Sequence, residues 1–349
     1  MPAHNKQTAG NGENIDGSGG VRMRLTGSAS FARLTGLFVV LLFLSACTHF
    51  NQGLTAYKHG DFQRALLEFR QAAESGDAEA QHNLGLMYVR GQGTEQNNME
   101  ARHWFRKAAE QGTAAAQYNL GLMCANGQGG PKDTVEAARW YRKAADQGDP
   151  KAQLNLGVLY DEGDGIPKNQ AEAVHWYRKA ADKGLAKAQF NLAVAYDKGE
   201  GIAQDDKEAV RWYKKSAEQG DPHAQYNLGL LYDEGKGMPQ DDKEAVRWYR
   251  KAAEQGDPHA QHNLGLMYAK GEGIAQDNVS AHLWLTLARL SGYDDALRSQ
   301  EALAKKLTAQ QLADSQKLAK DWQARLSPAP SHNDHTGTRA EVEGKPAPR

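Results

Sequence analysis

The stretch Ala224–Gly237, which reads AQYNLGLLYDEGKG, decides the fold. Its apolar residues recur at helical spacing as far as Tyr232, and Gly235 then ends the predicted helix. Asn227 and Gly229 stand inside this helix, although both residue types lower helix propensity. Packing against neighbouring structure must therefore offset the loss, because a short helix on its own is only marginally stable in water.

Nearly the same string returns along the chain at a constant step of 36 residues. The motif Asn-Leu-Gly, or a near relative of it, begins at Asn83, Asn119, Asn155, Asn191, Asn227 and Asn263. Tryptophans keep the same step at Trp104, Trp140, Trp176, Trp212, Trp248 and Trp284. A fixed period without insertions indicates tandem structural repeats.

Each repeat predicts two helices joined by a glycine loop. Asp221 and Pro222 supply an N-cap and a first-turn proline for one helix. A second cap, at Asp241 or Asp242, opens the helix that carries the tryptophan. Neither helix can bury its apolar face alone, so neighbouring repeats must stack into an all-α, right-handed α-solenoid.

Three motifs of the repeat resemble the Sel-one-like repeat family, a 36-residue relative of the tetratricopeptide repeat. They are Ala-x-x-x-Leu-Gly-x-x-Tyr, Gly-x-Gly and Trp-Tyr-x-Lys-Ala-Ala-x-x-Gly, and they return over residues 77–292. Cys124 replaces a tyrosine of this pattern, Ala193 replaces a glycine, and Leu285 replaces the last aromatic residue after tryptophan. We interpret Cys124 as a small core hydrophobe. We interpret the glycine inside the first helix as room for the tryptophan of the second.

The residues around the repeats divide into further segments. Residues 47–76 predict an N-terminal capping unit that looks like an ordinary tetratricopeptide unit, and residues 293–326 predict two C-terminal capping helices. Thr308 and Gln311 form a capping-box pattern at the start of the second of these helices. Residues 327–349 show no apolar periodicity and predict a disordered tail.

The first 46 residues predict a signal peptide, with Met23 as a candidate start. An almost wholly apolar run over residues 34–46 follows three arginines and ends in LSAC. This order resembles the bacterial lipobox, which implies that the Cys47 thiol carries lipid. Thr48 after the cysteine favours the outer membrane, facing the periplasm. The alternatives are an ordinary signal peptide followed by an incidental cysteine, and a buried helix.

Charge balance and motif content exclude several classes of protein. The 349 residues include 42 Lys+Arg and 43 Asp+Glu, so the basic stripe of a nucleic-acid binder is not expected. We find no Gly-x-Ser-x-Gly elbow, and the Gly-x-Gly loops follow helices instead of the strand that dinucleotide binding requires. We therefore predict a protein that is not an enzyme and uses no cofactor.

The resemblance to tetratricopeptide domains implies which residues face a partner on the concave side of the solenoid. One row consists of His82, Tyr118, Leu154, Phe190, Tyr226 and His262. The six repeated asparagines are candidates to hold the main chain of a bound peptide, or else to tie each helix to its neighbour. His259 and His262, with His223 one repeat earlier, suggest a metal patch. No cysteine or well-placed carboxylate completes such a set, so we predict no metal site.

Together these features predict a lipid-anchored scaffold or adaptor of the bacterial cell envelope that binds a protein or peptide partner. The resemblance implies roles in envelope processes, host interaction or signalling without choosing among them. The alternatives are a cell-wall protein that binds peptidoglycan, a protein that interacts with penicillin, and a virulence factor. Some relatives are linked to β-lactam hydrolysis, but the missing nucleophile motif speaks against that activity here.

Overall fold

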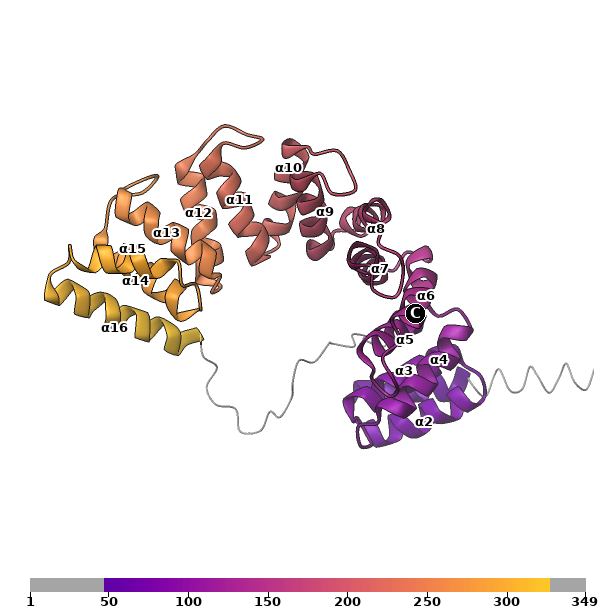
Figure 1. Ribbon diagram of the computed structural model, residues 1–349. Coiled ribbons are helices and arrows are strands. Elements are labelled where there is room, and N and C mark those ends of the chain that lie inside the picture. Colours follow the sequence, from indigo (N-terminus) through magenta and orange to yellow (C-terminus); the bar gives the residue numbers. More distant parts are fainter. Residues whose placement is uncertain (1–46, 327–349) are drawn as a thin grey trace, which may run out of the picture. The chain divides into compact units, whose positions relative to one another are not determined.

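The computed structural model describes residues 47–326, and no strand occurs within that range. The predicted signal peptide and the predicted tail lie outside the described residues. A helix over residues 47–58 comes first. The helices that follow (Figure 1) are α2 (Phe62–Glu74), α3 (Ala78–Arg90), α4 (Asn98–Glu110), α5 (Ala114–Asn126), α6 (Thr134–Asp146), α7 (Pro150–Glu162), α8 (Gln170–Asp182), α9 (Ala186–Lys198), α10 (Asp206–Glu218), α11 (Pro222–Glu234), α12 (Asp242–Glu254), α13 (Pro258–Lys270), α14 (Asn278–Leu290), α15 (Ala296–Ala304) and α16 (Ala309–Leu326). In the described part of the chain, no helix is long and apolar enough to cross a membrane.

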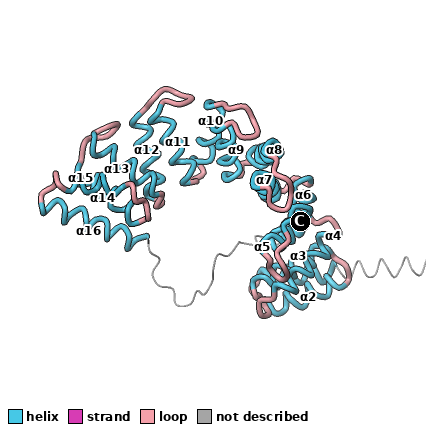
Figure 2. The backbone as a smooth tube through the Cα atoms, viewed as in Figure 1, coloured by secondary structure: helices cyan, strands magenta, loops and turns pink. Residues whose placement is uncertain are grey.

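The helices stack in sequence order. We number the repeats 1 to 6, from α3 and α4 to α13 and α14. The two helices of a repeat pack on each other, and each second helix also packs on the first helix of the next repeat. Figure 2 shows α5, α7 and α9 toward one side of the stack, and α6, α8 and α10 toward the other. We call these sides the first-helix face and the second-helix face. The predicted all-α solenoid is confirmed.

Local capping signals set the helix ends around the stretch Ala224–Gly237. The Asp221 carboxylate accepts a hydrogen bond of 2.9 Å from the Ala224 N–H, and Pro222 occupies the first turn of α11. Gly235 ends this helix in the left-handed conformation, with φ of 67°. Asp241 is the N-cap of α12, where its carboxylate accepts two main-chain N–H groups. These contacts satisfy donors that a helix end otherwise leaves unpaired.

The tryptophans of all six repeats are buried, each at most 8% exposed. In repeats 1 to 5, the lysine three residues later places its ammonium 4.1–4.5 Å from the centre of the indole ring. Such a cation over an aromatic face is favourable, and the lysine stem also shields the ring from water. The predicted burial of apolar surface between helices is therefore present in every repeat.

The C-terminal helices cover the last repeat. Both α15 and α16 pack on α14, and Trp322 of α16 meets Trp284 edge to face at 5.1 Å between ring centres. The predicted capping box is present, because the Thr308 N–H donates to Gln311 Oε1 at 3.0 Å and the Gln311 N–H donates to Thr308 Oγ1 at 3.3 Å.

In repeats 1, 2, 3 and 5, the glycine inside the first helix makes room for a ring other than the predicted one. A Cβ on Gly229 would lie 2.7 Å from Cδ1 of Tyr249, the residue after Trp248. That distance is shorter than any ordinary carbon contact. The expectation that this glycine accommodates the tryptophan is wrong, since the next aromatic residue takes the space.

The second glycine of each loop lies against the preceding repeat. Gly237 has φ of 74°, and a Cβ there would lie 2.5 Å from the main-chain oxygen of Asp206 in α10. Gly256, which follows α12, also has a positive φ, of 94°, but a Cβ there would meet nothing within 4 Å. Conformation alone favours glycine at residue 256, whereas conformation and close approach both require it at residue 237.

We predict that Gly237→Ala destabilises the protein more than Gly256→Ala. Each substitution forces a Cβ onto a left-handed residue, which costs roughly 1–2 kcal/mol. Only the Cβ at residue 237 also collides with main chain, and overpacking of this kind costs about 1–3 kcal/mol more. Urea unfolding of the two variants measures the difference. Equal losses in unfolding free energy would contradict the close approach between repeats 4 and 5.

Candidate functional site on the first-helix face

The predicted row of partner-binding residues divides into two groups. His82 and Leu154 are buried, at 5% and 8% exposed, and offer almost no surface to a partner. The half-buried members are Tyr118, Phe190, Tyr226 and His262. The rings of Tyr118, Phe190 and Tyr226 each lie 5.9–6.0 Å from the ring that follows the tryptophan of the same repeat. Core contacts therefore hold these rings in place while part of each stays in contact with solvent.

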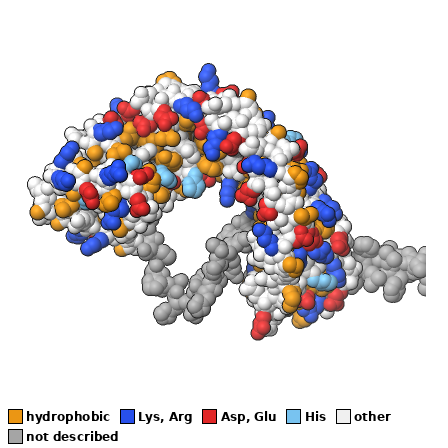
Figure 3. All heavy atoms as spheres, in the orientation of Figure 1, with side chains coloured by type: hydrophobic (Ala, Val, Ile, Leu, Met, Phe, Trp, Pro, Cys, Tyr) orange, Lys and Arg blue, Asp and Glu red, His pale blue; other side chains and the backbone are white. Residues whose placement is uncertain are grey.

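Ring contacts extend this row from one repeat to the next in repeats 4 to 6. Phe190 lies 6.1 Å from His223, and Tyr226 lies 5.6 Å from His259. Tyr293, after α14, lies 4.7 Å from His259 and 5.1 Å from His262. Figure 3 shows histidine and hydrophobic side chains together over the α11 and α13 part of the molecule. We call the following six residues the aromatic track: Phe190, His223, Tyr226, His259, His262 and Tyr293.

The three histidines of the suspected metal patch belong to this track. His259 and His262 flank the Tyr293 ring, and the His223 side chain, 70% exposed, lies 3.5 Å from the buried Asp257 carboxylate. Within residues 47–326, no group of three or more His, Cys, Asp or Glu side chains is arranged to hold a metal ion.

The repeated asparagines make contacts within the protein. A side-chain hydrogen bond joins the tyrosine after tryptophan to the asparagine of the next repeat in the pairs Tyr141–Asn155, Tyr177–Asn191 and Tyr249–Asn263. Each of these bonds links the second helix of one repeat to the first helix of the next. Asn227 differs, because its amide donates to the His223 main-chain oxygen at 3.0 Å. These contacts favour the alternative in which the asparagines tie each helix to its neighbour.

Asn83 and Asn119 are buried, and phenylalanine stands at the tyrosine position in the unit before each: Phe69 of the N-terminal capping unit and Phe105 of repeat 1. Phe105 offers no hydroxyl to Asn119, whose amide nitrogen instead lies 3.0 Å from Nε2 of His82. Asn119 Oδ1 and Asn83 Nδ2 are buried without a hydrogen-bond partner. At Asn155, Asn191 and Asn263, the tyrosine hydroxyl supplies the partner that phenylalanine cannot offer.

A second ladder of amides was not predicted. It consists of Gln81, Gln117, Gln153, Gln189, Gln225 and Gln261. Each donates its amide hydrogen to a main-chain oxygen at the end of the preceding second helix, as Gln225 does to Ala217 at 3.1 Å. Gln225 Oε1 in turn accepts from Gln255 at 2.8 Å. The signal was present in the sequence, since glutamine follows alanine in every repeat.

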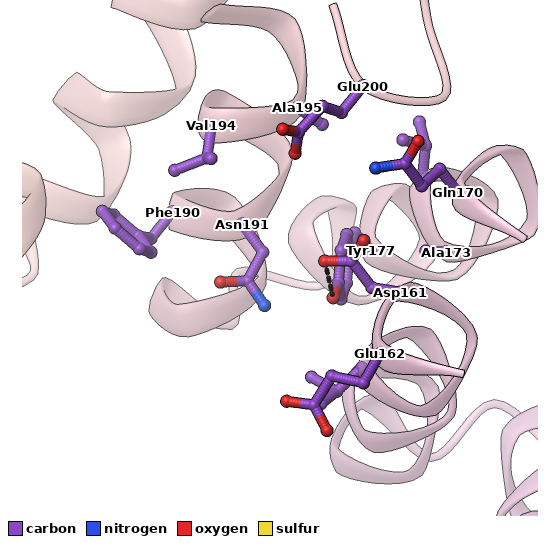
Figure 4. Close-up of a pocket in the computed structure, with 12 residues that line it drawn as sticks. Asp161, Glu162, Gln170, Ala173, Tyr177, Phe190, Asn191, Val194, Ala195 and Glu200 are labelled. Atoms are coloured by element: carbon purple, nitrogen blue, oxygen red, sulfur yellow. Dashed lines mark hydrogen bonds between the residues drawn. The ribbon is translucent and has the colours of Figure 1, made fainter. Parts of the chain in front are cut away.

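A pocket of about 230 Å³ lies between repeats 3 and 4, lined by residues of α7, α8 and α9 and by Glu200 in the loop after α9. Its lining includes the predicted site residues Phe190 and Asn191. In Figure 4, Asp161 faces Tyr177, whose hydroxyl donates to Asp161 Oδ2 at 3.5 Å, with Glu200 above them and Glu162 below. No lysine or arginine is among the lining residues. We call this site the acidic pocket.

Six consecutive segments of the chain match the Sel1 repeat, at residues 78–113, 114–149, 150–185, 186–221, 222–257 and 258–293. Together they span more than half of the sequence. The chain belongs to the Sel1 repeat family.

Solved structures of Sel1 repeat proteins are similar to this one. The Sel1 repeat protein from Oxalobacter formigenes is 38% identical, with a TM-score of 0.61, over 70% of this chain and 96% of that chain. The protective antigen c5321 of uropathogenic Escherichia coli, which displays an SLR fold, is 26% identical, with a TM-score of 0.45, over 84% of this chain and 89% of that chain. A search of curated proteins found no significant match. Sel1 repeat proteins typically mediate protein–protein interactions, and the family is generally a non-catalytic scaffold.

Cys124 departs from the Sel1 repeat tyrosine and changes the charges around it. An arginine of the preceding second helix donates to that tyrosine in the pairs Arg70–Tyr88, Arg142–Tyr160, Arg178–Tyr196 and Arg250–Tyr268. At Cys124 the corresponding Arg106 turns to Glu136, at 2.7 Å. This ion pair lowers the pKa of Glu136 to about 2.

Cys124 is fully buried in the hydrophobic core, as interpreted from the sequence, and its thiol also has polar neighbours. The thiol donates to Glu136 Oε2 at 3.3 Å, and Arg102 lies 3.3 Å from the sulfur. Burial raises the pKa of the Cys124 thiol to about 12, so the thiol is protonated at neutral pH.

His82 is the buried titratable group of the first Sel1 repeat. Burial, with a smaller contribution from the charge of Arg90, lowers the pKa of His82 from 6.5 to about 4. The unfolded chain therefore binds a proton at His82 between these two values, while the folded chain does not. Folding stability associated with His82 is complete above about pH 6.5 and is lost as the pH falls toward 4.

We predict that His82→Gln makes the protein less sensitive to acid. Glutamine keeps a hydrogen-bonding partner for Asn119 but does not titrate. The stability of the wild type relative to this variant should fall by up to about 3 kcal/mol between pH 7 and pH 4. Urea unfolding across this range measures the effect, and the exposed His103→Gln serves as the control. Parallel pH profiles for the wild type and His82→Gln would contradict the assignment.

Proposed function

We propose that this Sel1 repeat protein is a non-catalytic adaptor that binds an extended segment of a partner protein along the first-helix face. The aromatic track is the observation that carries the proposal. Its rings pack on one another from repeat to repeat and remain partly open to solvent. Rings held in this way offer apolar contact area at little cost in side-chain entropy.

Polar groups beside the track support a peptide as the ligand. Asn191 and Asn227 are half-buried and directly follow Phe190 and Tyr226 in the sequence. An amide carries two donor hydrogens and an acceptor oxygen, so the single contacts that Asn191 and Asn227 make within the protein leave groups that can pair with a main chain in either direction. The formal net charge of −1 gives no reason to expect a nucleic acid in this position.

We also propose that Cys47 carries lipid and anchors the protein to the outer membrane, facing the periplasm. The support comes from the sequence, where a positively charged segment and an apolar run precede LSAC. Cys47 is a free cysteine and is partly exposed.

Removing the track rings should abolish partner capture. The triple variant Phe190→Ala, Tyr226→Ala, His262→Ala removes three half-buried rings, and the triple variant Lys207→Ala, Lys243→Ala, Glu254→Ala is the control on second helices. A photo-crosslinking residue at exposed position 187 of α9 reports on the first-helix face in intact cells. We expect the adducts of the wild type to fall at least tenfold in the track variant and to persist in the control, with helicity retained in both. Adducts that persist without the rings would refute the proposed face.

Lipid attachment is tested by Cys47→Ala. We expect this variant to move from the membrane fraction to the soluble fraction, because it has lost the acceptor sulfur. Cys124→Ala, which removes the other cysteine of the chain, should leave the protein at the membrane. Membrane fractionation that is unchanged by Cys47→Ala would show that another feature holds the protein there.

A further inference from the structure

We propose that the acidic pocket holds a lysine side chain of the bound partner segment, with its ammonium group among Asp161, Glu162 and Glu200. This inference rests on the proposed function and assigns the chemistry of one anchor. It stands on the shape of the pocket, on its charge, and on a filled counterpart of the same site one repeat further along.

Short side chains create the space of the acidic pocket. Ala195 stands where the other five repeats have methionine or leucine. Val158 and Val194 stand where the other four repeats have leucine. The volume of about 230 Å³ is below the roughly 300–1,000 Å³ of clefts that hold small-molecule ligands. The pocket therefore suits a single side chain, and its apolar floor can cover an aliphatic stem.

The charge of the pocket selects the end of that side chain. Asp161, Glu162 and Glu200 contribute three carboxylates, and no basic residue lines the pocket. Lys198 precedes Glu200 by two residues but is exposed and is not part of the lining. A side chain with an apolar stem and a cationic end matches an apolar floor beneath an acidic rim.

The equivalent site between repeats 4 and 5 already contains a lysine of this chain. Lys236 stands one repeat after Glu200, and its ammonium lies 2.5 Å from Asp197 and 3.4 Å from Asp206. Asp197 stands one repeat after Asp161. Glu200 cannot supply the cation that Lys236 supplies, so the position beside Asp161 is left for an ammonium from outside.

The junction between repeats 5 and 6 provides a matched control. Glu272 is the counterpart of Glu200 there, but Lys270 pairs with it at 3.2 Å. Met267 occupies the position of Ala195 and is buried. The junction between repeats 5 and 6 therefore has the same acidic residue as the acidic pocket. It differs because Met267 fills the space and Lys270 already pairs with the carboxylate.

Nuclear magnetic resonance of the purified chain with labelled valine methyl groups tests the inference. The probe is N-acetyl-lysine methylamide, and N-acetyl-norleucine methylamide keeps the stem but lacks the ammonium. We expect the lysine compound to shift the Val158 and Val194 methyl signals saturably, with a Kd at least tenfold lower than that of the norleucine compound. Equal binding of the two compounds, or no shift with either, would overturn the proposal.

Three variants sharpen the test. Glu200→Gln should weaken binding of the lysine compound threefold or more, whereas Glu272→Gln should leave it unchanged. Glu200→Lys supplies the cation from within, as Lys236 does, and should abolish binding. Ala195→Leu fills the floor and should exclude both compounds. Binding to Glu200→Lys with the affinity of the wild type would refute the ammonium site.

The outcomes separate this inference from the proposed function. The probe reports on the acidic pocket alone, whereas crosslinking from residue 187 reports on partner capture. If capture requires the track while the lysine compound does not bind, only the lysine anchor is wrong. If the lysine compound binds but partner capture does not require the aromatic track, the pocket assignment holds and the proposed partner-binding face is wrong.

Discussion

The fold depends on the aromatic residue that follows the tryptophan in repeats 1 to 5. In repeat 5, the ring of Tyr249 fills the space that Gly229 leaves open in the same repeat, while its hydroxyl hydrogen-bonds with Asn263 of the next repeat. One side chain thus sets the approach of two helices and also attaches the following repeat. This double contact explains why asparagine and glycine, both weak helix formers, persist inside a helix that must pack on two neighbours.

Positions where this contact is altered show how the neighbouring residues respond. Phe105 fills the space beside Gly85 but has no hydroxyl, and Asn119 pairs with the buried His82 instead. Ala193 replaces the glycine in repeat 4, and Asn227 of the next repeat donates to a carbonyl of its own helix. The Tyr213 hydroxyl bonds to Asp197, as Tyr177 and Tyr249 bond to the equivalent Asp161 and Asp233. Because each repeat touches only its neighbours, such changes stay local and leave the stack intact.

Periodicity in the sequence was enough to predict the solenoid, and the Asp and Gly signals predicted the helix ends. Periodicity could not predict which ring meets Gly229. Trp248 and Tyr249 recur with the same step, so only their distances from Gly229 across the helix pair distinguish them. The row from His82 to His262 was predicted to face a partner throughout, but burial differs by repeat: His82 is buried and pairs with Asn119 of the second repeat, and Leu154 is also buried. The glutamine ladder was visible as a repeated Ala-Gln, yet a repeated polar residue looks the same in sequence whether it is buried or solvated.

The residue between the two loop glycines changes from repeat to repeat, while the glycines themselves are kept. That position holds Gln92, Gln128, Asp164, Glu200, Lys236 and Glu272. Where it is Lys236, the cation pairs with carboxylates of the preceding repeat and the junction satisfies its own charge. Where it is Glu200, the same geometry adds a carboxylate to a junction that already contains Asp161, and the short side chains of repeat 4 leave it open. A repeat that must keep its core constant can therefore acquire a binding site by changing one loop residue and shortening a few apolar side chains.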